Sequence, residues 1–220
     1  MSDKAASLTS DQIEELLLSA RYGDLEDLQA TLSPLLSSAS KAAELLASIQ
    51  NEDSNTLLHY ASANGHLKVV EYLLPHSDLP SLLAQNISGN TPLHWAGLNG
   101  HLEVVKVLVA HIEELEKENP EQAKRLNLIF HPKTEAAPAD GEEKEDDGSE
   151  RKLWDVRNKA GRGPMSEAQM REQEAVVKFL LERMIDGPEG STLQPAEPLL
   201  PKPSVEGSVE QQTEKLSLNN

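Results

Sequence analysis

The fold of this chain is decided by a stretch near its middle, Asn90-Thr91-Pro92-Leu93-His94-Trp95-Ala96-Gly97-Leu98-Asn99-Gly100-His101. A second stretch, Asn55-Thr56-Leu57-Leu58-His59-Tyr60-Ala61-Ser62-Ala63-Asn64-Gly65-His66, aligns on it without a gap, and every matched pair is 35 residues apart. The match continues to Val69-Val70 and Val104-Val105. A gapless repeat at fixed spacing indicates that the chain is built from stacked copies of one small unit.

Each copy predicts two short helices. Thr56 and Thr91 stand where a side-chain oxygen caps a helix, and Pro92 suits the first helical position. Gly65 and Gly100 follow where a residue with positive φ ends that helix. The apolar residues of the second helix recur at helical spacing and are Val69, Val70, Leu73 and Leu74 in one copy and Val104, Val105 and Leu108 in the next.

The Thr-Pro-Leu-His-x-Ala sequence at 91–96 resembles the signature of ankyrin repeats, which are about 33 residues long. In the earlier copy Leu57 replaces the proline. The resemblance implies an all-α repeat fold, an ankyrin-repeat solenoid of about four repeats with degenerate caps, an acidic insertion and a disordered C-terminal tail. Two copies alone would be marginal, because stacking needs about three or more units to bury a core.

Degenerate copies flank the two strong ones. Upstream, residues 16–28 keep the helical pattern and its glycine, Gly23. Thr9 and Gln12 predict a capping box in front of this helix. Residues 41–46 predict an extra helix before the first strong copy. Downstream, residues 158–168 and 176–181 resemble a further repeat, in which Gly163, Ser166 and Glu172 replace the threonine, histidine and glycine of the motif. We therefore expect weaker capping there and a first helix without a clean stop.

These patterns divide the chain. We expect a flexible N-terminus at 1–9 and a repeat domain at 10–185, with approximate repeats at 10–50, 51–85, 86–112 and 156–185. An insertion at 113–155 is predicted to extend the preceding helix to Phe130 with a break at Pro120, and then to form an acidic linker at 133–150. Trp154 is expected to pack the insertion back against the stack. Residues 186–220 contain five prolines and are predicted to be a disordered tail.

Composition and charge limit the partners. The 220 residues include 37 acids and 20 bases, for a net charge of −17, and the repeat-rich part is itself acidic. Direct binding to nucleic acid or to an anionic membrane is not expected, because phosphates are bound through Lys and Arg; a basic partner fits better. The chain has no cysteine, which excludes disulfides and thiolate zinc sites. Without an apolar N-terminal segment or an 18-residue apolar run, we expect a soluble intracellular protein.

No enzyme motif is present. The sequence lacks a phosphate-binding glycine loop, a Gly-x-Ser-x-Gly motif and a His-Glu-x-x-His motif, so we expect neither catalysis nor a cofactor or metal. His59 and His94 occupy the signature histidine position, which in the ankyrin family hydrogen-bonds neighbouring turns. His66 and His101 follow the helix-ending glycines and are expected to be turn residues.

Ankyrin-repeat proteins bind partners on a concave surface, through hairpin tips and the exposed side of the first helices. Carried over by the resemblance, the candidate protein-binding residues are Glu52, Asp53, Asn55, Tyr60, Asn64, Ser88, Asn90, Trp95, Leu98 and Asn99. Glu52 and Asp53 either meet a basic segment or form a solvated acidic face. Tyr60 and Trp95 either anchor a partner or only pack between repeats.

A narrower resemblance comes from the order of the segments. The cap Ala20-Arg21-Tyr22-Gly23, the two strong repeats, the weak repeat opening at 157–161 and the tail Thr213-Glu214-Lys215-Leu216-Ser217-Leu218-Asn219 together resemble the fungal, yeast-type ankyrin-repeat chaperones of small-subunit ribosomal protein S three. This implies a monomer that binds the newly made basic protein at its N-terminal region, prevents its aggregation and accompanies it from the cytoplasm into the nucleus.

Two other classes stay open at this stage. One is a generic ankyrin-repeat adaptor, such as a transcription-factor inhibitor or a proteasome-assembly factor. The other is an enzyme of unrecognised type, which a deep polar pocket would indicate.

Overall fold

The computed structural model describes residues 8–39, 41–131 and 152–185. The regular elements in these ranges are, in chain order, α1 (Ser10–Tyr22), α2 (Leu25–Ser38), α3 (Ala42–Ser48), α4 (Leu57–Ala63), α5 (Leu67–Leu73), the 3-10 turn η1 (Leu74–His76), α6 (Leu79–Leu82), α7 (Pro92–Leu98), α8 (Leu102–Glu118), α9 (Pro120–Phe130), α10 (Pro164–Met170) and α11 (Glu174–Ile185). Within the described ranges the only β-type pairing is an isolated bridge between Gln50 and Thr56. None of the helices described is long and apolar enough to cross a membrane.

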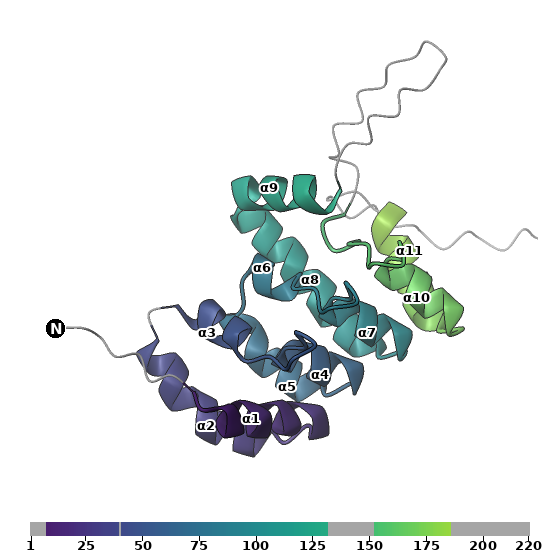
Figure 1. Cartoon of the computed structure of the whole chain (residues 1–220). Helices are drawn as coiled ribbons and strands as arrows, with labels where there is room; N and C mark the ends of the chain where they lie inside the picture. The colour runs from purple at the N-terminus through teal and green to yellow at the C-terminus, as the bar shows by residue number, and fades with distance from the viewer. Residues whose placement is uncertain (1–7, 40, 132–151, 186–220) are drawn as a thin grey trace, which may run out of the picture.

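Eight of the helices form four antiparallel pairs, α1 with α2, α4 with α5, α7 with α8, and α10 with α11. The first helices of the pairs lie side by side in the order α1, α4, α7, α10, and α5, α8 and α11 form a second row behind them (Figure 1). α3, η1 and α6 fill the connections of the early pairs. The expected all-helical stack of four units is confirmed for the residues described.

The helix starts follow the capping residues. Thr9 and Gln12 form the predicted capping box at α1. At α4 and α7 the motif threonine is the N-cap, and its backbone N–H donates to Nδ1 of the motif histidine, at 3.2 Å from Thr56 to His59 and 3.1 Å from Thr91 to His94. At α10 the N-cap is Gly163, which offers no side-chain cap, so the expected weaker capping is confirmed.

The turns that end the first helices need left-handed backbone. Gly65 and Gly100 have φ of 73° and 75°, and a Cβ at Gly65 would lie 2.5 Å from Nδ1 of His101 in the next unit. Each glycine therefore allows both the positive φ of the turn and the close approach of a side chain from the following unit. Our expectation that the α10 helix lacks a clean stop is wrong. α10 ends at Met170 and Glu172 adopts φ 57°, because the backbone of this turn makes the same closing bond, from Gln173 N to Ala168 O at 3.0 Å, as the glycine turns make.

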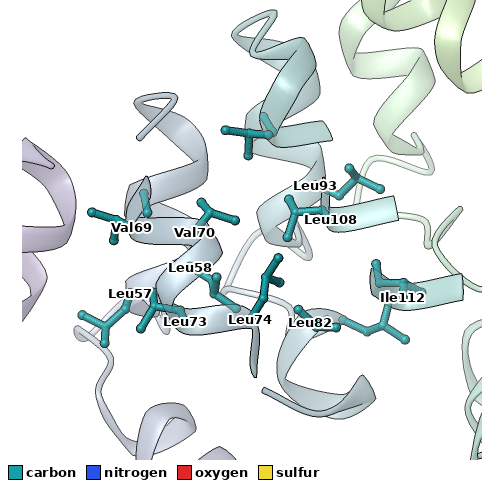
Figure 2. Close-up of a cluster of buried hydrophobic side chains, with 14 of the residues drawn as sticks. Leu57, Leu58, Val69, Val70, Leu73, Leu74, Leu82, Leu93, Leu108 and Ile112 are labelled. Carbon is teal, nitrogen blue, oxygen red and sulfur yellow. The ribbon is translucent and has the colours of Figure 1, made fainter. Parts of the chain in front are cut away.

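The core runs between the two rows of helices along the whole stack. Figure 2 shows one section of it, where Val69, Val70 and Leu73 of α5 meet Leu57 and Leu58 of α4, with Leu93, Leu108 and Ile112 of the next pair alongside. These side chains are buried. The predicted second-helix residues therefore supply the contacts between units, where burial of apolar area stabilises the stack.

The insertion begins as a helical extension of the third pair. α8 continues to Glu118, and α9 begins at Pro120, where the sequence predicted a break. Near the end of the insertion Trp154 is fully buried, and its indole Nε1 donates to Glu113 of α8 at 3.4 Å. Arg183 of α11 contacts the same carboxylate, so the chain is tied back to the stack as expected. The predicted acidic linker at 133–150, the tail at 186–220 and residues 1–7 of the N-terminus lie outside the described residues.

Candidate protein-binding groove

Three hairpin tips project beside the first helices, and they lie in register. In each tip an asparagine Oδ1 accepts from the backbone N–H four residues later, at 2.8 Å for Asn51, 3.0 Å for Asn86 and 3.0 Å for Asn158. Backbone bonds join the tips in sequence, from Ile87 N to Asp53 O at 3.0 Å and from Lys159 N to Ser88 O at 3.1 Å. Equivalent positions of the tips can therefore be compared directly.

Asparagine side chains also link one tip to the next. Asn86 Nδ2 donates to Asn55 Oδ1 at 2.8 Å, and Asn158 Nδ2 donates to Asn90 Oδ1 at 2.8 Å. We call this chain of contacts the asparagine ladder. Asn86 and Asn158 are buried, and each makes several further bonds to its own turn. Sequence reasoning singled out Asn55 and Asn90 but missed Asn86, although Asn51 and Asn86 are also 35 residues apart.

The motif histidines fix the tips to the helices. Nδ1 of His59 and of His94 accepts from the backbone of its threonine, so Nε2 carries the proton and donates to a carbonyl of the next tip, Asn90 O at 2.9 Å and Arg162 O at 3.0 Å respectively. Burial lowers the pKa of both imidazoles from 6.5 to about 4. Both rings are therefore neutral at physiological pH and hold the stack together, as the resemblance implied, and no group of three or more potential metal ligands occurs in the ranges described.

One position of each first helix faces the tips and forms the floor beside them. In the three motif copies this position is Tyr60, Trp95 and Glu167, and the turn glycines place Leu18 of α1 in line with them. The Tyr60 hydroxyl accepts from Asn51 Nδ2 at 3.1 Å. Trp95 Nε1 is buried with no acceptor among the described residues. Tyr60 and Trp95 are half-buried, so each contributes to packing and still presents part of its ring at the surface.

The fourth floor residue is a carboxylate held by its own tip. Glu167 accepts from Asn158 Nδ2 at 2.7 Å and from Arg162 Nε at 2.8 Å. Burial raises its pKa, but these hydrogen bonds and the Arg162 charge outweigh burial and keep the pKa below the ordinary value. Glu167 is therefore an ionised, paired group.

The tips and floor enclose three adjoining hollows, which together we call the inner groove. The first lies between α1 and the first tip and includes Glu14, Leu18, Arg21, Glu52 and Asp53 among its lining residues. The second lies between α4 and α7, with Tyr60 and Trp95 as its aromatic walls. The third lies at α10 and the last tip and includes Leu98, Arg162, Met170 and Arg171.

The comparisons with known proteins identify the repeat. A family model described as ankyrin repeats in three copies matches residues 11–119, the part that contains the first three helical pairs. The chain is an ankyrin-repeat protein. Its inner groove is formed by the hairpin tips and the first helices of the ankyrin stack.

Two matches indicate which ankyrin-repeat proteins this chain is similar to. Ankyrin repeat-containing protein YAR1 of Saccharomyces cerevisiae is 37% identical over 68 residues, which is 30% of this chain and 32% of the yeast protein. The sequence match thus spans about a third of the curated relative's length. A chain in the crystal structure of yeast ribosomal protein Rps3 in complex with its chaperone Yar1 matches 80% of this chain and 95% of its own length, with a TM-score of 0.54 and 28% identity. The similarity to the yeast-type proteins, inferred from segment order, is confirmed by both.

Nine of the ten predicted binding residues of the ankyrin stack line the inner groove. Glu52, Asp53 and Tyr60 line the first hollow, Asn55, Tyr60, Asn64 and Trp95 the second, and Ser88, Asn90 and Leu98 the third. Asn99, the tenth, is not among the lining residues. It is exposed, and its Nδ2 donates to Ala63 O of the preceding repeat at 2.7 Å. Which of these residues touch a partner stays a prediction.

The predicted binding residues differ in whether their polar side-chain atoms already form hydrogen bonds or ion pairs within the protein. The amide oxygens of Asn55 and Asn90 are engaged in the asparagine ladder, and Asn64 Nδ2 donates to Tyr60 O at 2.9 Å. Glu52 and Asp53 are exposed and make no ion pair with any residue that the structure describes. Sequence reasoning missed Glu14, Leu18 and Met170 as groove residues, although the turn glycines align Leu18 with Tyr60 and Trp95.

Proposed function

We propose that this ankyrin-repeat protein is a dedicated chaperone of small-subunit ribosomal protein S three, its own organism's counterpart of yeast Rps3. The observation that carries the proposal is the likeness to a chain of the yeast chaperone complex, which extends over 95% of that chain. The sequence match to YAR1 of yeast also supports it. The acidic first hollow adds a chemical reason, since ribosomal proteins are basic and are attracted to carboxylates.

In this proposal the inner groove receives the N-terminal region of the partner. Glu52 and Asp53 have no competing ion pair, so a lysine or arginine that reaches the first tip forms charge-assisted hydrogen bonds without first breaking a contact. The exposed parts of Tyr60 and Trp95 offer apolar area in the second hollow for an aliphatic or aromatic side chain.

The chaperone acts by mass action and needs no nucleotide. A protein that binds the soluble form of its partner lowers the concentration of free, aggregation-prone partner in proportion to its affinity. We propose that the complex forms in the cytoplasm, enters the nucleus and is dissolved when ribosomal RNA competes for the basic surface.

The test is co-expression of the partner with the full chain. We expect the ribosomal protein to stay soluble at low salt with the wild-type chain and to precipitate without it. The variant E52K/D53K should weaken binding by about tenfold, because each exposed charge contact contributes up to about 1 kcal/mol and reversal adds repulsion.

A matched control separates contact from net charge. The variant E118K/E121K reverses two exposed acids at the end of α8 and the start of α9, so it changes the net charge of the chain by the same +4. It should leave binding within about twofold of wild type. If the chain does not change the partner's solubility, or if affinity purification recovers another protein as its main partner, the proposal is wrong.

A further inference from the structure

The charge of the inner groove reverses from one end to the other. The register of the tips makes Glu52, Ile87 and Lys159 equivalent, since each follows the asparagine whose Oδ1 closes its turn. All three side chains are exposed. Glu52 lines the first hollow, whereas Ile87 and Lys159 lie on the tips beside the hollows and are not among their lining residues. Along the same row of tips the side chain is thus negative, then apolar, then positive.

The hollows repeat this order. Three carboxylates, Glu14, Glu52 and Asp53, line the first hollow with one guanidinium, Arg21. The lining of the third hollow contains Arg162 and Arg171 with a single acid, Glu167, which is already bonded to Arg162. Arg171 and Lys159 are exposed and make no ion pair with any residue in the described part of the chain.

Each end also exposes an apolar side chain beside its charges. Leu18 is 40% exposed at the acidic end and Met170 is 63% exposed at the basic end. Between them lie Tyr60 and Trp95, so apolar contacts are available in all three hollows, beside the paired Glu167 carboxylate in the third, while the charge changes sign. Such a surface fits an amphipathic segment and discriminates between its two orientations.

We propose that the inner groove binds a segment of mixed charge in one fixed orientation, with its basic part at Glu52 and Asp53 and an acidic part at Lys159 and Arg171. The inference rests on the proposed function and specifies the partner segment. A segment that is basic throughout would meet like charge at Lys159, which disfavours it.

The geometry sets the separation of the two charge groups. Neighbouring packed helices are about 8–10 Å apart, so two steps from the first tip to the third span about 16–20 Å. An extended chain covers this in about five or six residues and a helix in about 11 to 13. The acidic group of the partner segment should therefore lie about five or six residues from its basic group if the segment is extended, and about 11 to 13 residues away if it is helical.

The deciding variant is K159E/R171E in the full chain, measured against the purified ribosomal protein partner. If the groove were only an acidic attractor, two more acids would tighten binding of a basic protein. Our proposal predicts the opposite, a Kd raised by about tenfold, because an acidic group of the partner then faces two carboxylates. Both side chains are exposed and form no ion pair among the described residues, so the variant should melt within a few degrees of wild type.

K124E/R125E on α9 is the matched control. It makes the same −4 change in net charge with two exposed residues of α9, which belong neither to the hairpin tips nor to the lining of the three hollows. We expect its Kd to equal or fall slightly below that of wild type. A K159E/R171E variant that binds as tightly as this control overturns the orientation proposal, whereas a wild-type chain that does not bind the ribosomal protein at all overturns the proposed function itself.

Discussion

At the scale of single residues, the two motif histidines join the first helices of the groove to its hairpin tips. Each ring accepts a bond from its own cap through Nδ1 and donates through Nε2 to the following tip. The Nδ1 bond requires the neutral ring with its proton on Nε2, since a protonated ring has no acceptor, whereas Nε2 can donate in either protonation state. The capping bond at the start of α4 and of α7 therefore depends on the protonation state of a buried imidazole.

This dependence gives a pH prediction. Because burial lowers the pKa of His59 and His94 to about 4, the unfolded chain binds protons between pH 6.5 and about 4 that the folded chain does not. The contribution of the two rings to stability is complete above pH 6.5 and declines as the pH falls, by at most about 1.4 kcal/mol per pH unit for each ring.

The direct measurement is NMR of the imidazole Hε1 signals. In the folded chain the signals of His59 and His94 should not shift between pH 8 and pH 5.5, and in urea both should titrate near pH 6.5. A folded-state midpoint near 6.5 for either ring would contradict the hydrogen-bonding scheme.

The histidines and the turn glycines could be predicted from the sequence because their roles are local and recur in each copy. Asn86 and Asn158 could not, because their Nδ2 groups bond to the neighbouring tip, and that contact exists only once the register between units is set. For the same reason the sequence did not indicate that the side chains of Asn55 and Asn90 are engaged within the protein.

At the scale of elements, the stop of α10 shows how packing overrides a local rule. Glycine ends α1, α4 and α7, but α10 ends equally well with Glu172 at φ 57°. A residue with a Cβ is disfavoured in this region by roughly 1–2 kcal/mol. The turn keeps its closing bond from Gln173 N to Ala168 O, and the Gln173 side chain lies against Gly100 of the preceding unit. The sequence predicted a helix without a clean end because the motif reflects only the preference of glycine for positive φ, and not the packing around the turn.

Substitution with glycine should remove the free-energy cost of the positive φ at Glu172. We expect Glu172→Gly to raise the free energy of unfolding by about 0.5–1 kcal/mol, since glycine adopts positive φ freely but loses more entropy on folding. Urea unfolding would measure this. Glu172→Ala is the control, because it removes the same side chain and keeps the Cβ; it should give no gain. Equal stabilisation by both variants would mean that the Glu172 side chain, and not its backbone, is unfavourable.

At the scale of the whole molecule, the stack and the charge are separate features. The stack is held by apolar contacts between neighbouring units and by the histidine and asparagine bonds, so stability depends on nearest neighbours. The charge lies on exposed tips and helix faces that contribute little to that stability. The charge pattern of the inner groove can therefore vary without loss of the fold, which is why the repeat motif predicted the fold and said little about the partner.

The net charge of −17 gives a prediction for the rate of association. Long-range attraction of a basic ribosomal protein should make its association rate constant fall by at least about tenfold when ionic strength rises from about 0.01 M to about 0.15 M, as the Debye length shortens from about 30 Å to about 8 Å. The dissociation rate should change much less, since it depends on contacts in the groove. Stopped-flow mixing measures both rates.

Two variants of equal net charge separate the long-range field from the groove contacts. E118K/E121K and E52K/D53K both reduce the charge to −13, which is −17 plus 4, and both should slow association to a similar extent at low salt. Only E52K/D53K should also speed dissociation, because only its side chains line the inner groove. An association rate that does not respond to salt would show that capture depends on shape and apolar contact at the groove, with no electrostatic steering.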